Sequence, residues 1–164
     1  MSHCIDYLLG NARAYARAFD KGGLPITPRL GVAVVACMDA QLNVDGILGL
    51  TEGDAHVIRN AGGVITEDVI RSLTISQRLL ATSEIMLIHH ANCCMRTFRD
   101  DEFKSQIEAD TGIRPPWSPE AFGDATADAR QSIDRIKASP FLLNTNTVRG
   151  FVYNERTGKL AEVT

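Results

Sequence analysis

The sequence predicts an α/β fold in which a mainly parallel central sheet is flanked by helices. Short apolar runs rich in β-branched residues alternate along the chain with segments of helical periodicity, which is typical of such sheets. The chain has 164 residues, of which 45% are hydrophobic, and this is enough for one domain with a sizeable core. No repeat, low-complexity tract or interdomain linker interrupts it, so we expect residues 1–164 to form a single domain.

The first expected element is a helix over residues 5–19. Residues 21–28 contain two glycines and two prolines, which break regular structure and separate this helix from the first strand. We therefore expect residues 1–24 to form a helical arm that packs on a partner subunit. The apolar positions of the helix recur at helical spacing, at Leu8, Leu9, Ala12, Tyr15, Ala16 and Phe19.

The remaining elements alternate. Thr66 suits the N-cap of a helix at 67–80, because the two acidic residues that follow it complement the helix dipole. A helix from Asp100 to about Thr111 should end before a proline-rich, extended segment. The last strand should lead through a hairpin loop at 154–159 into another short strand. Strands are expected at 32–37, 55–59, 84–90 and 148–154, and further helices at 43–48 and 124–138.

Charge and hydropathy exclude several classes of partner. The net charge of −3 and the isoelectric point near 5.8 show no basic patch of the kind that nucleic acids need. No apolar run approaches the roughly 20 residues that span a bilayer. The first residues lack the charged-then-apolar layout of a signal peptide. We therefore expect a cytoplasmic protein with neither nucleic acid nor membrane as a partner.

Cys37, His90 and Cys93 form the main candidate site, because each falls where an apolar run ends. Parallel strands would bring Cys37 and His90 to the same edge of the sheet. Cys93 follows His90 by three residues, close enough for one turn to place both on a single Zn²⁺ ion. Three protein ligands leave one tetrahedral position open, as in catalytic zinc sites rather than structural ones.

A structural role is the alternative for each of these residues. A lone cysteine at a strand end is often a small core residue, and a lone histidine there is often held by a hydrogen bond. The presence of Asp39 two residues after Cys37, and of a glycine-rich turn at 59–63, favours the metal site. His89 precedes the candidate ligand and must point to the opposite face of its strand, so we expect it to be packed or hydrogen-bonded.

With these motifs the chain resembles the β-class carbonic anhydrases, and in length it is closest to their short archaeal and actinobacterial-like branch. The resemblance extends from about residue 25 to the C-terminus. It is carried by the Cys-x-Asp motif of residues 37–39 and the His-x-x-Cys motif of residues 90–93, in that order, with residues 55–63, 68–73, 112–115 and 148–153.

The resemblance implies a fold, a cofactor and a reaction. The sheet would have four parallel strands plus an antiparallel addition, in a homodimer or higher homo-oligomer with active sites near the interface. Cys37, His90 and Cys93 would bind Zn²⁺, and a zinc-bound hydroxide would hydrate CO₂ reversibly to bicarbonate. Asp39 would orient that hydroxide, or would ligate zinc in a resting form.

The resemblance also implies a small apolar pocket beside the metal, shaped by the turn Asn60-Ala61-Gly62-Gly63. Cys94 stands where the family commonly has glycine, directly after the second cysteine ligand. Glycine permits close backbone approach or a positive φ. The Cys94 side chain could narrow the pocket or present another thiolate.

Gln41 is a second departure, because the family has an arginine at this position that pairs with the aspartate and holds it off the metal. Gln41 has two amide donors but no charge. One hydrogen bond to a charged group contributes about 1.5–3 kcal/mol, so Gln41 could still orient Asp39 as its catalytic partner. Gln41 would compete with Zn²⁺ for Asp39 less well than an arginine, and we predict that Asp39 ligates zinc more readily, or has a higher pKa, than in the usual enzyme. Asn92 also stands where an aspartate is usual.

Two other functions fit the same motifs. Family members with this metal site can hydrolyse carbonyl sulfide or carbon disulfide, and only access to the pocket would separate these substrates from CO₂. The loss of the aspartate–arginine pair would also suit a catalytically impaired, zinc-binding relative with a sensor or interaction role. Retention of all three ligands and of Asp39 argues for the enzyme.

Overall fold

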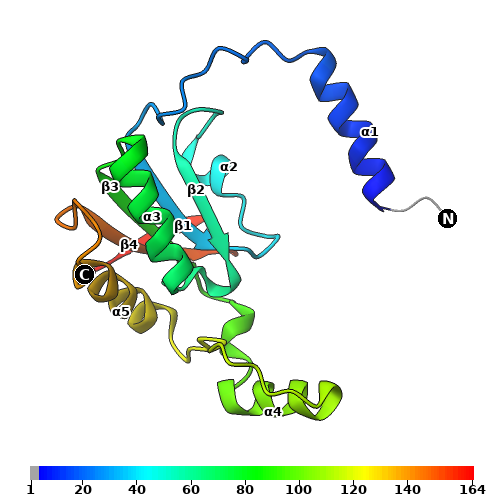
Figure 1. Ribbon diagram of the computed structural model, residues 1–164, viewed down its shortest axis with the longest axis vertical. Coiled ribbons are helices and arrows are strands. Elements are labelled where there is room, and N and C mark those ends of the chain that lie inside the picture. Colours follow the sequence, from blue (N-terminus) through cyan, green and yellow to red (C-terminus); the bar gives the residue numbers. More distant parts are fainter. Residues whose placement is uncertain (1–3) are drawn as a thin grey trace.

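A computed structural model describes residues 4–164 and contains a five-stranded sheet in the order β2-β1-β3-β4-β5 (Figure 1). The first four strands are parallel and β5 runs antiparallel to β4, which confirms the predicted sheet. The strands are β1 (Val32–Cys37), β2 (His56–Asn60), β3 (Glu84–His90), β4 (Val148–Asn154) and β5 (Lys159–Val163).

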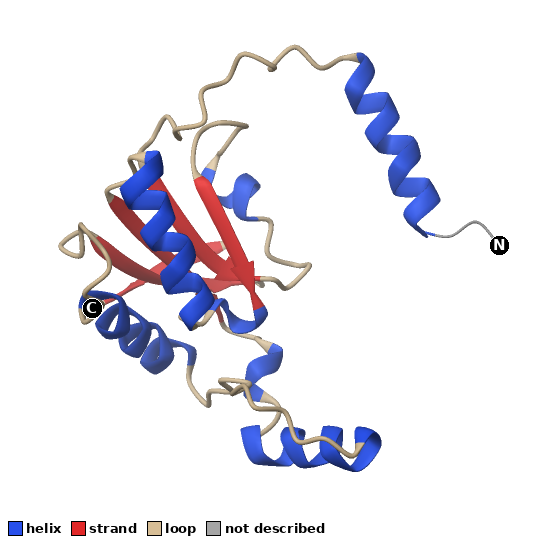
Figure 2. Ribbon diagram, in the orientation of Figure 1, coloured by secondary structure: helices blue, strands red, loops and turns tan. Residues whose placement is uncertain are grey.

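Helices cover both faces of the sheet. The helices α3 (Glu67–Leu80) and α5 (Ala125–Lys137) lie on one face, and the short α2 (Val44–Leu48) lies on the other (Figures 1 and 2). Thr66 caps α3 by accepting a hydrogen bond from the Val69 N–H, as predicted. Asp124 caps α5 in the same way through the Ala127 N–H, at 2.7 Å.

The two central strands, β1 and β3, are buried on both faces. Alternate residues of β1 enter two separate apolar clusters: Ala33 and Val35 pack toward α3 and α5, and Val34 and Ala36 pack toward α2. This is the burial that a continuous apolar run predicts for a central parallel strand. Two candidate ligands, Cys37 and His90, are the last residues of these buried strands.

Two helices stand away from the sheet (Figures 1 and 2). One is α1 (Cys4–Arg17) and the other is α4 (Asp100–Thr111), and neither has a buried residue. The α1 helix ends at Arg17, two residues before the predicted end, because the chain tightens into a turn in which the Ala18 N–H donates to the Tyr15 carbonyl. Over residues 4–164, every helix is too short or too polar to cross a bilayer.

Candidate metal centre

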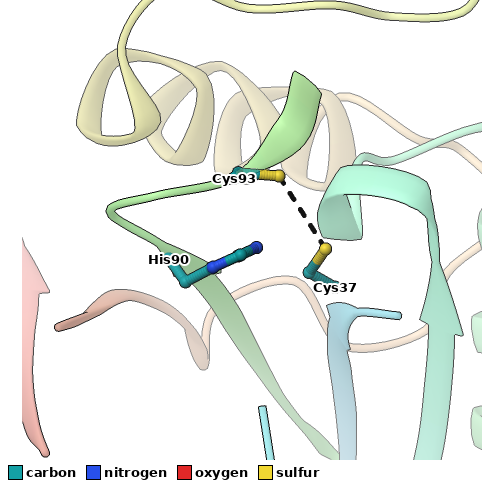
Figure 3. Close-up of side chains that lie close together, drawn as sticks. All are labelled: Cys37, His90 and Cys93. Carbon is teal, nitrogen blue, oxygen red and sulfur yellow. Dashed lines mark hydrogen bonds between the residues drawn. The ribbon is translucent and has the colours of Figure 1, made fainter. Parts of the chain in front are cut away.

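Three buried side chains meet at the carboxyl edge of the sheet (Figure 3). Cys37 is the last residue of β1 and His90 is the last residue of the neighbouring parallel strand β3, so both ends point to the same edge. Cys93 comes back to them from the loop after β3, and its Sγ lies 3.8 Å from that of Cys37. One donor atom from each residue lies within 4.8 Å of the other two.

These residues fit a zinc ion. The His90 ring points toward the two sulfur atoms (Figure 3), and its Nε2 is buried with no hydrogen-bond partner among the described residues. Buried polar atoms normally have a partner, so an unpaired imidazole nitrogen beside two thiols indicates a ligand position. Two thiolates and one imidazole are a donor set typical of Zn²⁺, and they leave a fourth position open.

The two thiols also differ in acidity. The hydrogen bond with Cys93 lowers the pKa of Cys37 against the opposing effect of burial. The same contact raises the pKa of Cys93. A metal ion that binds both sulfurs as thiolates would displace the proton that the Cys93 thiol holds more tightly.

Asp39 lies beside the donor set, with its Oδ2 3.9 Å from Nε2 of His90. Its Oδ1 accepts a hydrogen bond at 2.8 Å from the main-chain N–H of Gln41. Arg59 approaches the same loop but donates to the main-chain carbonyls of Cys37 and Asp39, at 2.9 and 2.7 Å. The guanidinium of Arg59 thus holds the loop that carries Asp39 through its main chain, and not through the carboxylate.

The four expected pocket residues take different positions. Asn60 and Ala61 line a pocket of about 390 Å³ together with Met95 and the aromatic side chains of residues 98, 103 and 117. Gly62 is buried with φ +83°, and a Cβ there would lie 3.0–3.2 Å from three neighbouring side chains. Cys94 begins a 3₁₀ turn, η2 (Cys94–Arg96), with an exposed thiol outside the donor set.

Sequence reasoning missed Glu155. Its Oε1 lies 2.5 Å from Nδ1 of His90, and its side chain is 8% exposed. Residue 155 was expected only as part of a hairpin loop, and no local pattern links it to a histidine 65 positions earlier. His89 behaves as expected, because it points away from the site and its Nε2 meets Asp128 Oδ2 at 2.6 Å.

Together, the parallel sheet and the Cys-His-Cys edge define a zinc-binding α/β protein. A family model described as carbonic anhydrase matches residues 32–149. Beta-carbonic anhydrase 1 of Mycobacterium tuberculosis is 58% identical over 159 residues, which cover 97% of this chain and 96% of the relative. The chain belongs to the β-carbonic anhydrase family.

Other relatives agree with this placement. The crystal structure of a carbonic anhydrase from Streptococcus mutans matches with a TM-score of 0.93 at 38% identity, and the match covers 100% of this chain and 99% of that one. A carbon disulfide hydrolase of Acidithiobacillus thiooxidans is 33% identical over 159 residues, covering 84% of this chain and 78% of the relative.

Proposed function

We propose that this protein catalyses the zinc-dependent, reversible hydration of CO₂ to bicarbonate. The observation that carries the proposal is the unpaired, buried Nε2 of His90, which faces two thiols beside the carboxylate of Asp39. The 58% identity to a β-carbonic anhydrase, against 33% to a carbon disulfide hydrolase, favours CO₂ over a sulfur analogue as the substrate.

Cys37, His90 and Cys93 are the residues that would hold the ion. When bound, Zn²⁺ acts as a Lewis acid that makes water a strong nucleophile near neutral pH. The ligands come from the ends of β1 and β3 and from the adjoining loop, and all three are buried, so they exclude bulk water from one side of the site. Their burial also strengthens the electrostatic interactions within it.

Asp39 is proposed to position the attacking water. Its Oδ1 is engaged by the Gln41 N–H, which leaves Oδ2 on the side of the donor set to accept a hydrogen bond from that water. Attack by the oxygen of that water on the carbon of CO₂ would give bicarbonate and one proton, and the proton would leave to the solvent. In this arrangement Gln41 acts through its main chain, and its side chain is exposed.

CO₂ is proposed to enter from the apolar side of the turn that Asn60 and Ala61 form. The pocket there is walled mainly by hydrophobic side chains, which suit a small molecule with no net dipole. Gly62 lets the turn pack closely against Met95, whereas the thiol of Cys94 is exposed.

We also propose that the working unit is a homodimer or higher homo-oligomer, formed from one domain of residues 1–164 whose arm, residues 1–24, packs on a partner. The support is the apolar surface that α1 exposes, including Ile5 at 69% and Leu8 at 60%. A cytoplasmic location is proposed because Cys37 and Cys93, only 3.8 Å apart, stay available as thiols in a reducing compartment.

Stopped-flow CO₂ hydration across neutral and mildly alkaline pH tests the activity, on protein of measured zinc content. Rapid, zinc-dependent turnover is expected, and chelation should abolish it. Full zinc occupancy without turnover at any pH would overturn the proposal. Assay of the same preparation with carbonyl sulfide and carbon disulfide would then separate a sulfur-substrate hydrolase from a binding protein.

A further inference from the structure

Glu155 occupies a position in the metal centre that follows from the register of the sheet. His90 of β3 pairs with Tyr153 of β4, so the turn that begins after Asn154 lies at the same edge as the candidate ligands. Glu155 is the first residue of that turn. Its carboxylate reaches the side of the imidazole that faces away from the two sulfur atoms, where Oε1 contacts Nδ1 at 2.5 Å.

The Glu155 carboxylate is itself fixed in place. Its Oε1 also accepts a hydrogen bond from the main-chain N–H of Asn92 at 3.0 Å, and its Oε2 is 3.4 Å from Nδ2 of Asn92. An aspartate at residue 92 would set two carboxylates against each other, whereas the amide of Asn92 donates to Glu155.

A carboxylate at Nδ1 decides which nitrogen of His90 carries the proton. With Nδ1–H donated to Glu155, the lone pair of Nε2 points toward Cys37 and Cys93, which is the tautomer that a metal ligand needs. The contact also restricts rotation of the ring, because one edge of the imidazole is tied to a buried acceptor. Nε2 is the atom left without a partner.

We propose that Glu155 is a positioning residue of the zinc centre: it fixes the tautomer and the orientation of His90, so the site is already arranged for Zn²⁺ before the ion binds. The proposal rests on the zinc-ligand role of His90 and is independent of which substrate the enzyme uses. Carboxylates that orient ligating histidines typically account for a factor of about 10–100 in metal affinity.

The decisive measurement is the rate at which zinc passes from the loaded protein to a chromogenic chelator. Glu155→Ala should release zinc about 10–100-fold faster than the unaltered protein. Glu155→Gln keeps an acceptor of the same size without the charge. Its rate of zinc release should therefore lie between those of the unaltered protein and Glu155→Ala. Glu162→Gln is the matched control. It also removes a carboxylate from this hairpin, but the Glu162 carboxylate pairs with Arg149 at the exposed surface and lies outside the donor set.

Two further readouts separate positioning from simple stabilisation of the hairpin. In the zinc-loaded protein the His90 Nδ1–H resonance should lie far downfield, shift upfield in Glu155→Gln and be lost to exchange in Glu155→Ala. Thermal unfolding of the chelator-treated proteins reports the structural contribution alone. Unchanged zinc release with a lowered unfolding temperature would overturn the proposal, as would equal release from the Glu155→Gln and Glu162→Gln proteins. Zinc release that follows the proposal in a protein without CO₂ turnover would refute the proposed activity alone.

Discussion

The main-chain N–H of Gln41 donates to Oδ1 of Asp39 at 2.8 Å, while the Gln41 side chain is exposed to solvent. The resemblance predicts that the amide side chain of Gln41 replaces the usual guanidinium as the partner of Asp39. The structure instead uses the backbone of the same residue. We therefore propose that the orientation of Asp39 depends on the fold of the loop after β1 rather than on the identity of residue 41.

Replacing Gln41 should accordingly have little effect. We expect Gln41→Ala to change kcat/KM for CO₂ hydration by less than about threefold, because the main-chain donor remains. Asp39→Asn, which removes the accepting carboxylate, should lower kcat/KM by about 100-fold or more. Stopped-flow assays at matched zinc content check both values. A loss in Gln41→Ala as large as that in Asp39→Asn would show that the side chain holds the carboxylate after all.

Gly63 should be needed for the position of Cys37. It has φ +70°, and a Cβ there would lie 2.9 Å from the Cys37 backbone nitrogen. We expect Gly63→Ala to lower the free energy of unfolding by more than the about 1–2 kcal/mol that left-handed backbone alone costs an alanine, and to lower zinc content as well. Urea unfolding and metal analysis measure the two effects.

The matched control for this change is Gly112→Ala. Gly112 has a similar φ of +76°, but a Cβ there would have no neighbour within 4 Å. It should show the cost of the backbone conformation alone, about 1–2 kcal/mol, with normal zinc content. Equal losses in the two variants would mean that contact with β1 plays no part.

The apolar stripe of α1 should determine the oligomeric state. Leu8 is 60% exposed in the single chain, and a glutamate there would place a charge in the proposed subunit contact. We expect the unaltered protein to be at least dimeric and Leu8→Glu to shift it toward monomer in sedimentation experiments. Ala14→Glu adds the same charge to α1 away from the stripe and should leave the assembly unchanged. A monomeric unaltered protein would contradict the proposed arm.

Asp54 should make the stability of the fold depend on acid pH. Its carboxylate accepts hydrogen bonds from Arg29 Nε at 2.8 Å and from the N–H and hydroxyl of Thr51, and these contacts lower its pKa to about 2. An unfolded aspartate titrates near about 3.9. The folded state therefore favours the ionised form, so this stabilisation is complete above about pH 4 and is lost as the pH falls through about 2.

Comparison with Asp54→Asn isolates that contribution. The variant should unfold at a lower urea concentration at neutral pH, and the difference between the two proteins should shrink as the pH is lowered from about 4 to about 2. Acid release of zinc affects both proteins and cancels in the difference. If the difference in stability between the two proteins stayed constant across this pH range, Asp54 would not be the source of the pH dependence.

Much of the fold and the donor set could be read from local sequence. Apolar runs that end at Cys37 and His90 mark the strand ends, and parallel strands must end at one edge, so the two side chains meet there. Cys93 is tied to His90 by a three-residue spacing. The cap at Thr66 is equally local, because its side chain bonds a backbone N–H only three residues away.

Contacts between distant segments could not be read in this way. Glu155 meets His90 only because β4 pairs beside β3 in one register, and nothing near residue 155 encodes that pairing. The choice of the Gln41 main chain over its side chain depends on the path of the loop, which Arg59 pins from the neighbouring strand β2. Local periodicity reports which residues are buried and where elements end, whereas the partners of a buried polar atom are set by packing across the sheet.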